Sequence, residues 1–251
     1  MGKVISFANQ KGGVAKTTSV FNVGVALSKR GKKTLMIDLD SQASLSISAG
    51  LEPFEHELSI VSVLGKKSES INMCMLELNK NLYIVTSRLE LAQLEIEMIG
   101  RQARELILKR ALIPVLDDFD YILIDCPPQL SILTINALSC SDYVIIPVKT
   151  DYLAYRGMEL LHESIKEIQE IINQKLKILG IIATLYESRV KDDNKILFAI
   201  KDKYNVIATI KKLAIAKKGI YDGLTVADQS PDNDIAKEYD KVCEYIIKVG
   251  K

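Results

Sequence analysis

The chain has 251 residues, of which 48% are hydrophobic and 26% are charged, and its formal net charge is +1. This composition is ordinary for a globular protein, and it excludes a chain that binds nucleic acid through overall positive charge. The four cysteines are widely spaced, which favours a reducing compartment and argues against an iron–sulfur cluster or a structural zinc site. No apolar run is long enough to span a membrane, so we expect a cytoplasmic protein with one domain over residues 1–251.

Residues 4–18 predict a phosphate-binding loop. An apolar stretch at 4–8 indicates a buried strand, a glycine-containing turn follows, and Lys16 opens a helical pattern. In this order of elements, backbone N–H groups of the turn and the positive end of the helix dipole face a polyphosphate. The Lys16 ammonium can reach β- and γ-phosphate oxygens, and the Thr17 hydroxyl can bind Mg²⁺. The predicted cradle consists of Gly12, Gly13, Val14, Ala15, Lys16, Thr17 and Thr18.

This loop departs from the general pattern G-x-x-x-x-G-K-[ST], because Gln10 and Ala15 stand where its two glycines would be. It fits the variant K-G-G-x-x-K-[ST]-[ST], which begins with an additional lysine, Lys11. The alternative is a glycine turn between a strand and a helix, with lysines that are only solvated. Ala15 can replace glycine at little cost if it has a negative φ in the first helical turn.

A predicted strand at 33–38 ends in an acidic cluster that contains Asp38 and Asp40. Carboxylates at the C-terminal end of a strand, one βα unit after the phosphate loop, lie where an open α/β sheet binds its ligand. The alternative is that Asp40 forms a turn or caps a helix. Residues 43–81 are less regular, with a short helix expected at 59–64.

A second acidic strand end lies further along the chain. Residues 119–125 form an apolar strand that ends in Asp125, and two prolines then force the chain out of the sheet. Such an aspartate can hold a metal-bound water beside a γ-phosphate. The competing interpretation is a core strand that happens to end in Asp.

The remaining pattern alternates strands with helices, which predicts an α/β fold with a mostly parallel, twisted sheet covered by helices on both faces. A strand is expected at 82–85 and a helical period over 89–116 with a break near Gly100. Later elements are expected at 131–140 (helix), 142–148 (strand), 155–173 (helix), 177–184 (strand), 191–203 (helix) and 234–248 (helix).

Positive charge concentrates at residues 189–218, where nine basic and three acidic side chains give a local net charge of +6. Such a local excess suits sequence-independent contact with DNA phosphates. The alternative is a solvated helix face. The candidate DNA-binding residues are Arg189, Lys191, Lys211, Lys212, Lys217 and Lys218.

With these motifs assembled, the chain resembles the ParA/Soj family of plasmid and chromosome partition ATPases. These are P-loop proteins with a deviant Walker A motif, related to MinD and the nitrogenase iron protein. The resemblance is carried by residues 9–18, 38–42, 91–97, 108–112, 121–128, 133–138 and 144–148.

The resemblance implies a Mg²⁺-dependent ATPase that is slow without its partner. Lys16 would bind the β- and γ-phosphates of ATP, and Thr17 and Asp125 would lie at Mg²⁺. Lys11 would reach across an ATP-bound sandwich dimer to the partner subunit's phosphates, and Asp40 would position or activate the attacking water. The dimer would bind double-stranded DNA non-specifically until a ParB-type protein stimulates hydrolysis, which implies a nucleoid-associated protein.

The sequence also departs from the family. Ser41 stands where proline is frequent, and Lys211 stands where many relatives have proline. No N-terminal helix-turn-helix is expected before the first strand, so operator binding is not expected. The alternative function is a MinD-like membrane-cycling or cargo-positioning ATPase. It would need a basic amphipathic C-terminal helix, whereas acidic residues punctuate 236–251, and we expect no membrane partner.

Overall fold

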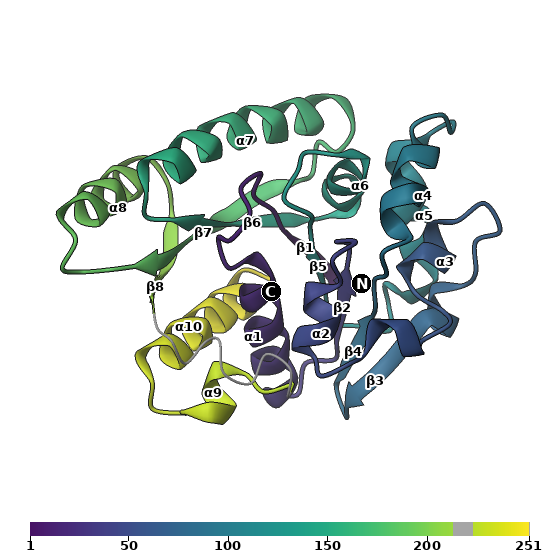
Figure 1. The fold of residues 1–251 in the computed structure, drawn as a ribbon, viewed down its shortest axis with the longest axis horizontal. Coiled ribbons are helices and arrows are strands. Elements are labelled where there is room, and N and C mark those ends of the chain that lie inside the picture. The colour runs from purple at the N-terminus through teal and green to yellow at the C-terminus, as the bar shows by residue number, and fades with distance from the viewer. Residues whose placement is uncertain (213–222, 251) are drawn as a thin grey trace.

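The computed structural model describes residues 1–212 and 223–250 (Figure 1). Its strands form an eight-stranded sheet in the order β3-β4-β2-β5-β1-β6-β7-β8, in which every pairing is parallel except β3–β4. This mostly parallel sheet confirms the predicted fold class. The strands are β1 (Lys3–Phe7), β2 (Thr34–Asp38), β3 (Met75–Asn79), β4 (Leu82–Val85), β5 (Tyr121–Asp125), β6 (Tyr143–Lys149), β7 (Lys177–Tyr186) and β8 (Val206–Lys211).

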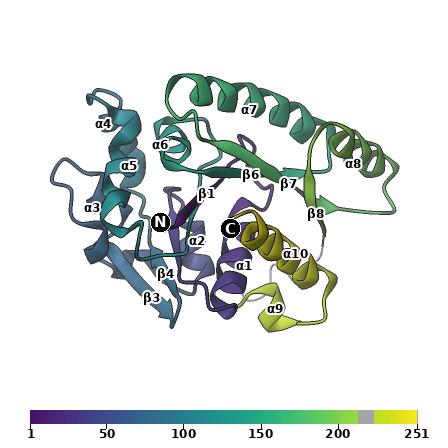
Figure 2. The same cartoon turned by 180° about the vertical axis from the view of Figure 1, so that it is seen from behind.

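Helices cover both faces of this sheet, and the two views show them on opposite sides (Figures 1 and 2). One face packs against a group of helices that share a core: α1 (Lys16–Lys29), α2 (Ser44–Ser48), α9 (Val226–Gln229) and α10 (Asp234–Val249). The other face packs against α3 (Ile60–Leu64), α4 (Leu91–Met98), α5 (Ile107–Leu112), α6 (Ile132–Cys140), α7 (Tyr152–Ile171) and α8 (Lys191–Lys203). Short 3₁₀ turns are η1 (Pro53–Glu55), η2 (Ile71–Cys74), η3 (Arg104–Leu106) and η4 (Ile113–Val115).

The central strand β5 explains why the acidic strand ends meet. All of its residues are buried, as expected for a strand with helices on both faces. Its neighbours β1 and β2 run parallel to it, and the register sets Asp125 beside both Phe7 and Asp38. Because parallel strands end at the same edge of a sheet, the phosphate loop after β1 and both acidic strand ends lie together there.

Most predicted elements have close counterparts, and the helix expected at 191–203 is α8. The helix expected from 155 begins earlier, at Tyr152, because the Asp151 carboxylate caps it by accepting from Ala154 N at 2.8 Å. Strands β3 and β8 and helices α2 and α9 were not predicted. Within the described ranges, no helix combines the length and the apolar character needed to cross a membrane.

Candidate nucleotide-phosphate site

Two residues of the loop between β1 and α1 have a left-handed backbone conformation. Gly13 has φ of +70°, a conformation that glycine adopts without a steric penalty. Ala15 has φ of +60° and lies directly before α1, so the condition for replacing glycine at little cost, a negative φ, is not met. A side chain with a Cβ costs about 1–2 kcal/mol in this conformation. The loop therefore keeps a glycine-like geometry even where the sequence has alanine.

Lys16 is the first residue of α1, and it is only 7% exposed. Its ammonium donates to the Lys11 carbonyl at 3.2 Å. Burial lowers the pKa of Lys16, while the nearby Asp125 and Asp40 carboxyl groups act in the opposite direction. Burial removes water from the Lys16 ammonium, and the nearby carboxyl groups favour its charged form. It is therefore well placed to bind phosphate, which carries more negative charge than a carboxylate.

Thr17 and Asp125 come from distant segments and meet at this edge. The Thr17 hydroxyl donates to Asp125 Oδ2 at 2.6 Å. Asp125 Oδ1 is buried and accepts no hydrogen bond from the described residues. Burial raises the pKa of Asp125 well above its usual value, and the neighbouring Asp38 carboxyl raises it further. The Thr17 hydroxyl and the Asp125 carboxyl group, whose Oδ1 has no partner among the described residues, are oxygen donors of the kind that Mg²⁺ uses together with phosphate and water.

Asp38 supports this edge, although the sequence analysis placed it only as a member of the acidic cluster. It is fully buried, and its Oδ2 accepts from the Ser46 amide at 2.9 Å and from the Ser46 hydroxyl at 2.8 Å. Its Oδ1 accepts from Asp40 N at 3.2 Å. Burial raises the pKa of Asp38 to about 6. These bonds fold the segment after β2 back on itself and so orient Asp40.

Asp40 lines a cavity of about 430 Å³ together with the phosphate loop from Gly12 to Thr18. Pro128, Gln42 and three residues of α2, Ser44, Ile47 and Ser48, complete its wall. Asp40 Oδ1 also accepts from Gln42 N at 3.0 Å, as a turn-forming aspartate does. The two interpretations given for Asp40, a turn residue or a ligand-facing carboxylate, are therefore compatible.

The Lys11 ammonium is paired with a carboxylate of the same chain. It lies 2.9 Å from Asp151 Oδ1 and 3.2 Å from Asp151 Oδ2. The Lys149 ammonium reaches the same carboxylate at 3.1 Å. Burial would raise the pKa of Asp151, but the Ala154 amide and the two ammonium groups lower it overall. Asp151 was missed because it lies 140 residues from Lys11 in sequence and resembles an ordinary helix cap.

Two of the predicted DNA-binding residues form ion pairs within the chain. Lys211 pairs with Asp234 at 2.7 Å, and Lys212 pairs with Glu187 at 2.7 Å. Arg189 and Lys191 make no ion pair with residues 1–212 or 223–250. Lys217 and Lys218 lie outside the described residues. Their contact with DNA stays a prediction.

Comparisons with known proteins agree on the family. A profile of the AAA domain matches residues 2–178. The chromosome-partitioning ATPase Soj of Treponema pallidum is 35% identical over 253 residues, an alignment that covers 98% of each chain. The chain belongs to the ParA/Soj family of partition ATPases. An uncharacterized protein of Mycobacterium tuberculosis H37Rv is 39% identical over 203 residues, which are 80% of this chain. The alignment spans 64% of the length of that relative.

Solved structures of similar proteins contain nucleotides. Cobyrinic acid a,c-diamide synthase of Mycobacterium smegmatis with bound ADP and magnesium has a TM-score of 0.84 and 32% identity, and the match covers 100% of this chain and 97% of that one. A plasmid partition protein of Borrelia burgdorferi bound to AMPPNP has a TM-score of 0.86 and 27% identity, over 99% of this ParA/Soj chain and 100% of its own.

Proposed function

We propose that this ParA/Soj chain is a Mg²⁺-dependent ATPase that binds DNA as an ATP-bound dimer and leaves DNA after hydrolysis. The observation that carries the proposal is the cluster at the end of β1 and β5, where Lys16, Thr17 and Asp125 meet beside a cavity. The nucleotide-bound structures of similar proteins support ATP and Mg²⁺ as its ligands.

Each residue of the cluster has a role in this proposal. The N–H groups of residues 12–18 and the Lys16 ammonium bind the β- and γ-phosphates. Thr17 and Asp125 hold Mg²⁺, directly or through water. The bound ion neutralises charge that develops on the transferred phosphoryl group. Asp40, on the wall of the same cavity, orients the attacking water.

Dimerisation follows from the second loop lysine. In the proposed ATP-bound sandwich, Lys11 leaves Asp151 and binds the phosphates of the partner subunit. The phosphates of ATP in a facing protomer carry more negative charge than the Asp151 carboxylate, so they compete for the Lys11 ammonium and shift it toward the partner subunit. Association thereby depends on the nucleotide state, which is what a cycle of binding to and release from DNA requires.

DNA contact is proposed at the basic stretch, beginning with Arg189 and Lys191 at the start of α8. A ParB-type partner would stimulate hydrolysis and end the DNA-bound state, so the protein would be cytoplasmic and nucleoid-associated. The MinD-like alternative is less well supported, because the apolar side of α10 is already buried against the sheet and α1. A helix that uses its apolar face in the core has none left for a membrane.

The test is duplex DNA binding by the purified chain with ATP, with ADP and without nucleotide, across a salt series. We expect binding to arbitrary duplex only with ATP, and a steep loss of affinity as salt rises. Lys16→Ala should abolish both nucleotide binding and DNA binding, and Lys29→Ala, at the other end of α1, is the matched control. ATP-driven dimers that bind no DNA at any salt concentration would contradict the DNA-binding part and leave the ATPase assignment standing.

A further inference from the structure

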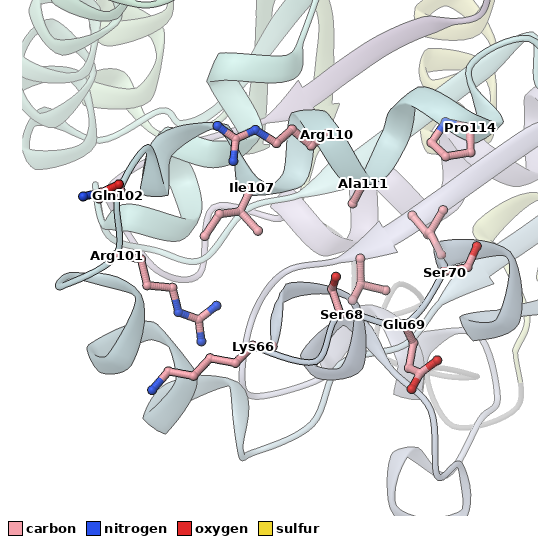
Figure 3. Close-up of a pocket in the computed structure, with 13 residues that line it drawn as sticks. Lys66, Ser68, Glu69, Ser70, Arg101, Gln102, Ile107, Arg110, Ala111 and Pro114 are labelled. Carbon is pink, nitrogen blue, oxygen red and sulfur yellow. The ribbon is translucent and has the colours of Figure 1, made fainter.

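A second cavity, of about 670 Å³, lies between α5 and the segment that joins α3 to η2 (Figure 3). It belongs to the sheet face covered by α3–α8, and it shares no lining residue with the cavity over the phosphate loop. Val63, Ile71, Ile107 and Ala111 supply apolar surface. The volume is in the range of sites that bind small organic molecules. We refer to it as the α3–α5 pocket.

Positive charge surrounds this apolar surface. Lys66, Arg101 and Arg110 line the α3–α5 pocket, and Glu69 is the acidic residue among its lining side chains. Figure 3 shows the Arg101 guanidinium directed toward the segment that carries Lys66 and Ser68, while Arg110 projects from α5 above Ile107. An apolar floor with cations from three separate positions favours a ligand that combines an anionic group with an apolar body.

Arg101 supplies the most specific observation. Its Nη1 donates to the Leu64 carbonyl at 2.6 Å. Its Nε and Nη2 are buried and donate to none of the residues in 1–212 or 223–250. Glu97 Oε2 lies 3.9 Å from Nη2, which is close enough for attraction but too far for a hydrogen bond.

The two unused nitrogens, Nε and Nη2, form one edge of the Arg101 guanidinium. That edge matches the two oxygens of a carboxylate or phosphate in a bidentate pair. Leaving buried donors unpaired costs about 1–3 kcal/mol each, so an anion that accepts from them would recover this loss. Because water does not reach these atoms, a ligand that binds them must displace the groups that cover them, and the guanidinium is directed toward the 65–70 segment (Figure 3). This segment has no helix or strand of its own and is anchored by the Glu69 amide, which donates to Ser62 O at 3.0 Å.

We propose that the α3–α5 pocket binds a small organic anion. A phosphate or carboxylate group of the ligand accepts from Arg101 Nε and Nη2, Lys66 and Arg110 add charge at the rim, and the apolar part of the ligand packs on Ile71 and Ile107. This site is separate from the proposed ATP site and does not depend on it. We take the source of the anion to be a free metabolite rather than a membrane lipid, because the apolar residues line an open pocket that also contains Lys66, Arg101 and Arg110 and do not form an exposed apolar face.

The experiment measures binding of phenyl phosphate and benzoate to the full chain by calorimetry and by NMR of the Arg101 Nε–H resonance. Lys16→Ala serves as the background, so that the phosphate loop does not capture the probes. Phenol, which lacks the anionic group, and inorganic phosphate, which lacks the apolar body, are the matched probes. We expect saturable binding of the two complete probes, a shift of the Arg101 resonance, and at least about tenfold weaker binding of either matched probe.

Variants locate the site. Lys66→Gln combined with Arg110→Gln should weaken binding at least about tenfold. Lys67→Gln combined with Lys109→Gln removes the same charge from neighbouring positions that do not line the pocket, and it should leave the affinity unchanged. Arg101→Gln should abolish binding, and the rim variants keep the test decisive if Arg101→Gln destabilises the fold.

Three outcomes would overturn the proposal. The first is the absence of saturable binding by phenyl phosphate and benzoate. The second is equal weakening by the rim pair and the control pair, which would indicate general electrostatic attraction. The third is binding to vesicles that contain anionic phospholipid without binding to the soluble probes, which would indicate a lipid headgroup site.

Discussion

The Lys11 ammonium is bound to the Asp151 carboxylate of its own chain, at 2.9 Å and 3.2 Å from the two oxygens. Both side chains are about one third exposed, so solvent screens the ion pair and its contribution to stability is small. In the proposed dimer, the partner subunit's ATP competes with Asp151 for this ammonium. In that proposal, the contact with Asp151 affects how readily the ATP-bound chain dimerises.

Asp151→Asn should lower the ATP concentration that gives half-maximal dimerisation. Asparagine still caps α7, so the change removes the negative charge and keeps the helix start. An exposed ion pair contributes about 0.2–1 kcal/mol, so a shift of up to about fivefold is expected. Sedimentation across an ATP titration measures it. Asp192→Asn, which breaks the Lys195 pair on α8, is the control, and equal midpoints for both variants would rule out competition by Asp151.

Ala15→Gly should raise the free energy of unfolding by up to about 1 kcal/mol. Glycine relieves the left-handed strain at φ of +60° but adds entropy to the unfolded chain, and the two effects partly cancel. Urea denaturation measures the difference. Ala26→Gly, inside the same helix α1, is the control and should lower the free energy of unfolding by about 1 kcal/mol. A loss at Ala15 as large as the loss at Ala26 would contradict the left-handed conformation.

Asp40→Ala should leave ATP-driven dimers intact while phosphate release falls by about 100-fold or more. Asp40 lines the cavity, but its negative carboxylate is not among the groups proposed to bind the phosphates. Its proposed role is therefore in hydrolysis and not in ATP binding. Sedimentation with ATP and a phosphate-release assay measure the two properties on the same sample. Ser41→Ala, at the adjacent position, is the control. Normal turnover in the Asp40 variant would remove this residue from the mechanism.

Asp38→Asn should change how stability depends on pH. Burial raises the pKa of Asp38 from 3.8 to about 6 in the folded chain, so between these values the folded state holds a proton that the unfolded state has lost. The stability of the unmodified chain, relative to Asp38→Asn, should therefore fall as pH rises from about 4 to about 6 and stay level above that range. Urea denaturation at several pH values measures it. A difference that rises with pH instead would mean that the folded state favours the charged carboxylate.

The local pattern of the chain was sufficient for much of the fold and part of the site. The pattern at 4–18 predicted the strand β1, the loop and the helix α1, and alternation of strands and helices predicted the parallel sheet. The strand before Asp125 was predicted as well. These features follow from side-chain periodicity and glycine placement, which act over a few residues. Strand β8 was not predicted, because its six residues lie within the basic stretch 189–218, which was interpreted from its charge and not from its apolar residues.

The remaining features of the site depend on which strands become neighbours. Thr17 meets Asp125 across 108 residues, and Lys11 meets Asp151 across 140 residues. Asp38 acquires its raised pKa because β2 pairs with β5 and buries both strand ends. The left-handed φ of Ala15 reflects the path that the chain takes between β1 and α1. The sequence by itself determined most of the elements and their order. The tertiary structure alone determined these contacts, because strand pairing and burial arise from packing across the whole sheet and leave no local pattern.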